Sequence, residues 1–331
     1  MAIGASMTDI LIYGAGAIGS FLGYLLSGSP GKNRAYVAGA DNIALLGRAG
    51  HMRAIKEAGL RVDLGEREAI LPFRHCFSCL DDLKASDFYP DLVIVCVKTH
   101  SLPALVQELQ QSGLLQERLK ESLFILLMNG MGNREVFLHS GLDPARLKEG
   151  ITSFGVLLAG EGRVELKGRG KTILQDGISG AERDFLAECF SEKGFEIEFA
   201  PDFQRQQFLK LLVNAAINPI TALTRRQNGT VLQPALVGTV QAVVAEAVAV
   251  AAVEELEIPE EEALDLVFSV AEKTAANTSS MLQDVLHGRS TEIEAINGYI
   301  VRQGRKNGIA VPVNEALYSM VWSISEPPAD E

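Results

Sequence analysis

Residues Thr8 to Leu26 read TDILIYGAGAIGSFLGYLL, and this stretch decides the fold. Residues 10–13 form a short apolar run, typical of a strand that is buried on both faces. Residues 14–19 then turn the chain, and apolar side chains follow at helical spacing: Phe21, Leu22, Leu25 and Leu26. A GxGxxG turn between a strand and a helix near the start of a chain predicts dinucleotide binding, with a glycine-rich turn without a ligand as the alternative.

The glycines of this turn have separate physical roles. Gly14 permits a tight turn, Gly16 lets the backbone approach a pyrophosphate, and Gly19 lets the helix pack against the strand. The first turn of the helix offers unpaired N–H groups and the positive end of its dipole to phosphate. The predicted cofactor-binding turn therefore consists of Gly14, Ala15, Gly16, Ala17, Ile18 and Gly19.

Length and charge narrow the class of protein. The chain has 331 residues, enough for two domains with separate cores, and a net charge of −12. That charge argues against nucleic acid and anionic membrane as partners. No apolar run reaches the roughly 18 residues of a membrane span, and no basic segment precedes an apolar one at the N-terminus. We expect a cytoplasmic protein whose oligomeric state stays open, a homodimer included.

The cysteines give no metal site. Cys76 and Cys79 have CxxC spacing, but no second pair or nearby histidine cluster completes a zinc site. Thiols of the core or of loops in a reducing compartment are the interpretation we favour.

Polar side chains follow the buried strands of the expected sheet. The second strand, 42–48, ends at Arg48 without an acidic residue beside it. An acidic residue would bind the ribose of NAD, whereas arginine accommodates the phosphate of NADP, so NADP is favoured over a plain surface role for Arg48. Lys98 follows the strand 92–97 and Asn129 follows the strand 123–128. Both are candidate cofactor contacts, with solvent exposure and an ordinary turn as the alternatives.

The rest of the pattern divides the chain at Pro201-Asp202. Before this point we expect a long loop over residues 27–41 and a hairpin over residues 60–73. We also expect a second hairpin, with tips at 160–162 and 168–170, and a final edge strand over residues 195–199. Beyond it the strand signal nearly vanishes and helical segments follow, over residues 204–218, 236–256, 259–274, 291–307 and 314–322. The fold class is therefore α/β, with a doubly wound sheet in residues 1–201 and an all-α domain in residues 202–331.

The first helix of the second domain carries a polar stripe. Lys210, Asn214 and Asn218 are spaced i, i+4, i+8 and share one face of an otherwise apolar segment. A solvent-facing stripe usually carries good helix formers, and asparagine is a poor one, so a polar cleft is favoured. Pro219 ends or kinks the helix directly afterwards.

A second polar group follows later in the chain. Asn277 and Ser280 supply uncharged donors and acceptors suited to a small hydroxy acid, and Glu292 opens the predicted helix 291–307. An acidic residue favoured by the helix dipole is the alternative for Glu292.

These motifs together resemble the ketopantoate reductase (2-dehydropantoate 2-reductase) family. The matching pieces are GAGAIG at 14–19, Arg48, VKTH at 97–100, NGMG at 129–132, KLLVNAAINPITAL at 210–223, NG at 228–229 and NTSSMLQDVLHGRSTEIEAINGYIVRQGRKNGIAVP at 277–312. The last two long motifs are the specific ones, and the resemblance covers the chain in order.

The resemblance implies a Rossmann domain followed by a helical domain similar to the C-terminal domain of 6-phosphogluconate dehydrogenase. It implies that Lys210 is the catalytic lysine and that Glu292 binds the substrate hydroxyl. Asn214, Asn218, Asn277 and Ser280 fall on substrate positions, and Lys98 and Asn129 on positions near cofactor and substrate. The implied reaction is NADPH-dependent reduction of ketopantoate in pantothenate biosynthesis. Reduction of another 2-keto acid, or a non-catalytic NADP-binding sensor, are the alternatives.

Overall fold

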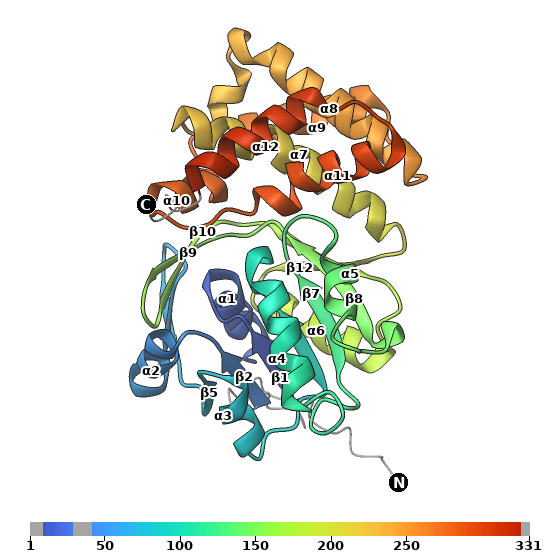
Figure 1. The fold of residues 1–331 in the computed structure, drawn as a ribbon. Coiled ribbons are helices and arrows are strands. Elements are labelled where there is room, and N and C mark those ends of the chain that lie inside the picture. The colour runs from blue at the N-terminus through green and yellow to red at the C-terminus, as the bar shows by residue number, and fades with distance from the viewer. Residues whose placement is uncertain (1–8, 29–41, 326–331) are drawn as a thin grey trace, which may run out of the picture. The chain divides into compact units, whose positions relative to one another are not determined.

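A computed structural model describes residues 9–28 and 42–325 of the chain. The chain divides into two compact units (Figure 1). Unit 1 comprises Met1–Met128 and Arg134–Phe203, and unit 2 comprises Asn129–Asn133 and Gln204–Glu331. Residues 29–41, which make up most of the predicted loop 27–41, lie outside the described residues.

An eight-stranded sheet forms the centre of unit 1. Its order is β12 (Glu196–Ala200), β11 (Lys171–Gln175), β8 (Leu147–Thr152), β7 (Leu123–Leu127), β6 (Leu92–Val95), β1 (Ile10–Tyr13), β2 (Ile43–Leu46) and β5 (His75–Phe77). The strands from β8 to β5 are parallel, and β11 pairs antiparallel with β8. Counting only this sheet, the parallel strands have the order 3-2-1-4-5-6 of a Rossmann domain. The predicted doubly wound sheet is confirmed, and β12 is the predicted edge strand.

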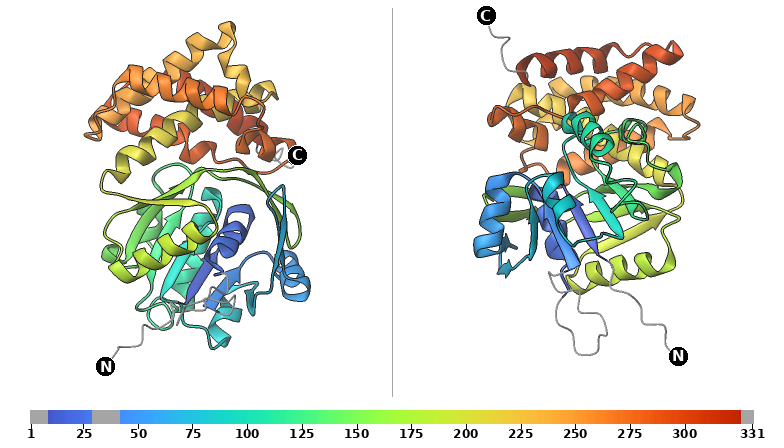
Figure 2. Two further views of the ribbon diagram at one scale, coloured as in Figure 1. Left: turned by 180° about the vertical axis from the view of Figure 1, so that it is seen from behind. Right: turned by 60° about the horizontal axis from the view of Figure 1, so that its bottom comes forward.

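Helices cover both faces of this sheet. Ile10 and Ile12 pack in one core with α1 (Ala17–Leu26) and α6 (Gly180–Glu192), whereas Leu11 and Tyr13 pack in another. The second core includes α3 (Leu80–Ala85), α4 (Leu102–Ser112) and α5 (Asn133–Leu138). Figure 1 shows α4 in front of the sheet, and the left panel of Figure 2 shows α6 in front of the opposite face. Burial on both faces explains why the strands are continuous apolar runs.

A four-stranded sheet, in the order β4 (Glu68–Leu71), β3 (Leu60–Asp63), β10 (Arg163–Gly168) and β9 (Gly155–Gly160), also belongs to unit 1. The predicted hairpin over 60–73 is confirmed, because β3 and β4 pair antiparallel. The turn at 160–162 joins the antiparallel strands β9 and β10. The predicted hairpin turn at 168–170 is wrong, because β10 pairs with β3 and β9 while β11 pairs with β8 and β12. At this turn the chain passes from one sheet to the other, which local alternation does not distinguish from a hairpin.

Unit 2 is helical. It contains α7 (Phe203–Thr224, which begins at the last residue of unit 1), α8 (Pro234–Val253), α9 (Glu260–Lys273), α10 (Ser280–Leu286), α11 (Asn297–Asn307) and α12 (Pro312–Ser325). Two expectations need correction. First, α7 continues through Pro219, because Ile217, Ile220 and Ala222 are buried in the core of this unit, and that burial outweighs the roughly 3 kcal/mol cost of an interior proline.

Second, Glu292 does not open a long helix. A short 3₁₀ turn, Ile293–Ala295, follows it, and α11 begins at Asn297. The non-helical backbone of Ile296, with φ −103° and ψ −95°, separates the two segments. Ile293 and Ile296 are both buried in the helical core, so tertiary packing sets this break.

One helix of the described residues, α8, is long and apolar enough to cross a membrane by length and composition. One face of it is buried in the core of unit 2, through Val240, Val243, Val244, Ala247, Val250 and Ala251. Its Glu246 carboxylate accepts hydrogen bonds from the N–H groups of Val313 and Asn314, both at 2.9 Å, where α12 begins. A carboxylate at a helix N-terminus is favourable, so α8 has the contacts of a core helix.

Candidate active site

The glycine turn of unit 1 is fixed by its neighbouring strands. Gly14 has φ +99°, and a Cβ atom there would lie 2.7 Å from the backbone of Cys96 and Val97, so only glycine fits. The N–H groups of Gly14 and Ala15 both donate to the Leu46 carbonyl at 2.9 Å. The turn is therefore held between the ends of β6 and β2.

The same turn has the features of a pyrophosphate cradle. A Cβ atom on Gly19 would meet the Gly14 carbonyl group, with the carbonyl carbon at 3.0 Å, so α1 starts in direct contact with the turn. A Cβ atom on Gly16 would meet nothing within 4 Å, so this backbone is open to a ligand. The first turn of α1 has no acidic residue and no side-chain cap, which leaves its N–H groups for an anion. These residues fit a dinucleotide.

Two cations follow the strands on either side of β1. Arg48 is exposed, lies two residues beyond the end of β2, and immediately precedes α2 (Ala49–Ala58). Lys98 is partly buried and follows the end of β6. In a parallel sheet these positions share one edge with the glycine turn, which is the edge where such sheets bind ligands.

Unit 2 brings three of the predicted residues together. The Lys210 ammonium on α7 donates a hydrogen bond to Asn129 Oδ1 at 2.9 Å. Asn129 Nδ2 in turn donates to Glu292 Oε2 at 2.8 Å. The amide orientation follows from its neighbours, since an ammonium only donates and a carboxylate only accepts. One asparagine thus bridges the cation and the carboxylate.

The segment 129–133 owes its position to the residues that follow Glu292. Met131 N–H donates to the Ala295 carbonyl at 3.0 Å. Gly130 has φ +75°, and a Cβ atom there would lie 2.5 Å from the Ala295 Cβ, so glycine is required. The same 3₁₀ turn therefore positions both Asn129 and Glu292. Asn133, which the sequence analysis did not single out, holds the Asn129 carbonyl with an Nδ2 hydrogen bond of 3.0 Å.

Burial sets the charge state of the lysine. Glu292 is only 6% exposed, and Lys210 is partly buried. Burial lowers the pKa of Lys210 to about 8, and the Glu292 carboxylate opposes that shift by favouring the charged amine. The result is an ammonium that is mostly charged near neutral pH yet able to give up its proton. Such a group is suited to general acid catalysis.

The other predicted substrate residues lie in different settings. Asn214 is partly buried and Asn218 is buried, one and two turns along α7 from Lys210. Asn277 and Ser280 are exposed, and Ser280 is the first residue of α10. The sequence analysis missed α10 as a helix, although Ser279 caps it through a hydrogen bond from Leu282 N–H at 3.1 Å.

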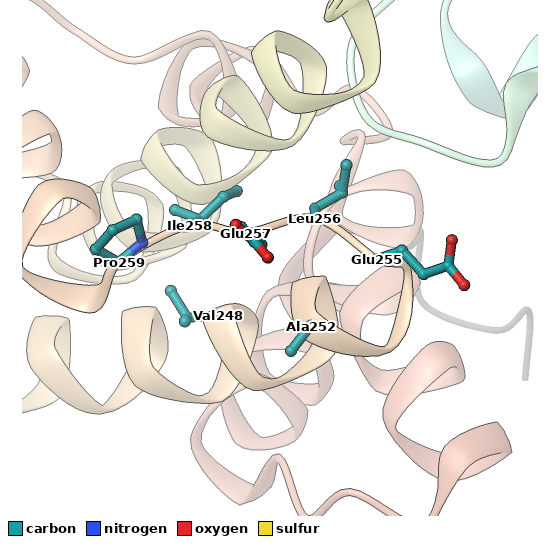
Figure 3. A pocket seen from close by; sticks show the side chains of 7 residues that line it. All are labelled: Val248, Ala252, Glu255, Leu256, Glu257, Ile258 and Pro259. Carbon is teal, nitrogen blue, oxygen red and sulfur yellow. The ribbon is translucent and has the colours of Figure 1, made fainter.

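A pocket in unit 2 offers different chemistry. It has a volume of about 460 Å³ and is lined by Val248, Ala252, Glu255, Leu256, Glu257, Ile258 and Pro259, as Figure 3 shows. Its charged side chains are both acidic, which disfavours an anionic keto acid. Among the described residues, no group of three His, Cys, Asp or Glu side chains is placed to hold a metal ion.

Comparison with known proteins connects both units to one family. Residues 10–178 match the family described as "Ketopantoate reductase PanE/ApbA", and residues 202–325 match "Ketopantoate reductase PanE/ApbA C terminal". The 2-dehydropantoate 2-reductase of Vibrio cholerae is 34% identical over 282 residues, which cover 84% of this chain and 91% of the relative. The protein of the same name from Bacillus subtilis is 32% identical over 319 residues, 95% of this chain and 96% of the relative.

Solved structures show the same fold. The PanE/ApbA family ketopantoate reductase of Ralstonia eutropha JMP134 has a TM-score of 0.81 and 26% identity, covering 96% of this chain and 98% of its own. A D-mandelate dehydrogenase with NADH and anilino(oxo)acetate has a TM-score of 0.80 and 27% identity, covering 96% and 97%. Because the matches include both the glycine turn and the Lys210 helix, this chain belongs to the ketopantoate reductase PanE/ApbA family.

Proposed function

We propose that this chain catalyses the NADPH-dependent reduction of 2-dehydropantoate (ketopantoate) to pantoate, a step of pantothenate biosynthesis. The observation that carries the proposal is the Lys210–Asn129–Glu292 arrangement, in which one amide bridges a cation and a carboxylate. The names of the relatives with 32–34% identity support this choice of substrate. A cytoplasmic location and a homodimer stay predictions.

A bound nicotinamide cofactor supplies the hydride that reduces the ketone carbon. The turn at 14–19 and the N-terminus of α1 hold its pyrophosphate, because they present N–H groups without an acidic neighbour. Arg48 binds the 2′-phosphate that distinguishes NADPH from NADH. Lys98 and Asn129 are the further proposed cofactor contacts.

Lys210 acts on the ketone oxygen. Negative charge develops on this oxygen during reduction, and the nearby ammonium stabilises it and then donates a proton from Nζ. The lowered pKa of Lys210 makes this transfer easier than from an ordinary lysine. Asn129 orients the amine, since its Oδ1 accepts one of the ammonium hydrogens.

Glu292 and the asparagines select the substrate. The buried Glu292 carboxylate accepts a hydrogen bond from the hydroxyl of ketopantoate, and an analogue without that hydroxyl loses this hydrogen bond in a site from which water is largely excluded. Asn214, Asn218, Asn277 and Ser280 supply the uncharged donors that the substrate carboxylate needs.

A second substrate has specific support. The structural likeness to a D-mandelate dehydrogenase bound to NADH and anilino(oxo)acetate, at 27% identity, favours reduction of other 2-keto acids on the same scaffold. A sensor that only binds NADP is less favoured, because it needs neither the ammonium nor the carboxylate.

A substrate panel tests the proposal. NADPH oxidation is measured with ketopantoate, with 3,3-dimethyl-2-oxobutanoate, which lacks only the hydroxyl, and with phenylglyoxylate. We expect ketopantoate to have a kcat/KM at least about 10²-fold above its dehydroxylated analogue, and Glu292→Gln to shrink that ratio. Preference for phenylglyoxylate would instead support the mandelate-type substrate, and NADPH binding without turnover of any keto acid would support the sensor.

A further inference from the structure

The turn between β9 and β10 packs tightly on helix α2. The N–H of Gly162 donates to His51 Nδ1 at 2.9 Å, and the Gly162 carbonyl accepts from Arg61 N–H at 2.8 Å. A Cβ atom on Gly162 would lie 3.1 Å from the Ala54 Cβ, so the turn is in van der Waals contact with the helix. The position of this turn is therefore set by contacts on both sides.

His51 connects the turn between β9 and β10 to the glycine turn at residues 14–19. Because Nδ1 accepts from a backbone N–H, the ring hydrogen is on Nε2, which donates to Ser20 Oγ at 2.9 Å. Ser20 Oγ donates to the Ala15 carbonyl at 3.4 Å. The imidazole is buried, and burial lowers its pKa, which keeps the ring neutral in this chain of hydrogen bonds.

The turn between β9 and β10 places the Glu161 carboxylate at the start of α2. A Cβ atom on residue 50 would overlap the Glu161 side chain, with the carboxyl carbon at 2.7 Å, so Gly50 makes room for it. Arg48 immediately precedes the helix, and α2 has no acidic residue in its own first turn. Glu161 is exposed, so its charge is accessible to a ligand at this place.

We propose that Glu161 is a specificity-determining residue that weakens binding of the 2′-phosphate of the cofactor. The inference rests on the proposed function, because it takes the start of α2 and Arg48 as the place of that phosphate. A carboxylate there occupies the favourable end of the helix dipole and repels a second anion. Arg48 attracts the phosphate, and the two side chains have opposite effects on the choice between NADPH and NADH.

The expected size of the effect follows from Coulomb's law. A carboxylate and a phosphate dianion about 6 Å apart in water repel each other enough to change a binding constant about tenfold. Salt reduces this effect, because about 0.1 M salt screens exposed charges beyond about 10 Å and weakens them at shorter range. Removal of the charge should therefore favour the phosphorylated ligand at low salt.

The test uses two nucleotides and does not depend on turnover. Calorimetric titration of the full chain gives the affinities of adenosine 2′,5′-bisphosphate and adenosine 5′-monophosphate at low salt. We expect Glu161→Gln and Glu161→Ala to raise the ratio of the two affinities about tenfold, with the monophosphate affinity unchanged. Glu196→Gln is the matched control, because it removes one exposed carboxylate from β12, which five strands separate from β2 in the sheet, and it should leave the ratio unchanged.

The outcomes separate this inference from the proposed function. An unchanged ratio in the Glu161 variants, with both nucleotides bound, overturns the inference and leaves the reductase proposal intact. An equal change for both nucleotides also overturns it, since it indicates a general structural role. If neither nucleotide binds the wild-type chain, the cofactor site is refuted and the inference with it.

Discussion

Replacement of Lys210 by methionine tests the proposed acid most sharply. Methionine has nearly the length of the lysine stem but carries neither charge nor proton. A positioned general acid contributes about 10²- to 10⁴-fold to turnover, so Lys210→Met should lower kcat by at least about 10²-fold. Binding of NADPH should change little, because the glycine turn and Arg48 belong to other elements of the chain.

The pKa of Lys210 gives this prediction a second measurable consequence. With a pKa of about 8, about nine-tenths of the amine is charged at about pH 7 and about one-tenth at about pH 9. In the proposed mechanism the ammonium is the active form, so kcat/KM, which reports the pKa of the ligand-free enzyme, should fall about tenfold over this interval. An ordinary lysine, with a pKa of 10.5, would give almost no decrease.

The assay is the pH profile of steady-state NADPH oxidation with ketopantoate, for wild type, Lys210→Met and Lys210→Arg. Arginine keeps the charge at every working pH, so any activity that Lys210→Arg retains should lack the alkaline decrease. A Lys210→Met variant within about fivefold of the wild-type turnover would refute the role of Lys210 as the acid. The same decrease in Lys210→Arg would assign the titration to another group.

Three further perturbations probe the rest of the site. Arg48→Ala should raise the KM for NADPH far more than the KM for NADH in the same assay, and equal increases would remove Arg48 from phosphate binding. Gly130→Ala should lower thermal stability and abolish turnover, because the new methyl group overlaps the Ala295 segment that positions the site. Gly141→Ala is the control: at φ +85°, with nothing within 4 Å of the new Cβ, it introduces only backbone strain and should keep its activity. Glu292→Gln should shift the alkaline decrease of kcat/KM to lower pH, because the carboxylate raises the pKa of Lys210 in the ligand-free enzyme; a shift to higher pH would contradict that electrostatic role.

The first half of the chain was the easier to predict. The apolar runs at 10–13, 92–97 and 123–128 carry their own signal, because strands buried on both faces must be continuously apolar. The glycine turn was equally easy to predict, because position 14 needs a positive φ and a close contact with Cys96 that only glycine allows. Local alternation does not predict which strands pair. The predicted hairpin of β10 and β11 is therefore wrong, and β11 pairs with β8.

Local patterns were misleading where tertiary packing decides. Pro219 predicted an end or a kink of the helix; the end is wrong, because the buried residues around Pro219 keep α7 helical to Thr224. The helical spacing around Glu292 predicted one continuous helix, whereas the structure has a break at Ile296. The polar residues Lys210, Asn129 and Glu292 were all identified from sequence and resemblance. The Asn129 amide joins residues that are 81 and 163 positions away from it in the sequence, and no local pattern predicts such contacts.

The most direct test of the central claim is a single turnover. The protein, in excess over NADPH, is mixed with NADPH and ketopantoate. The loss of NADPH and the formation of pantoate are followed together. We predict one pantoate formed for each NADPH consumed, at a rate that Lys210→Met lowers by at least about 10²-fold. NADPH that binds but stays unoxidised, with no pantoate formed, would contradict the claim that this chain is a ketopantoate reductase.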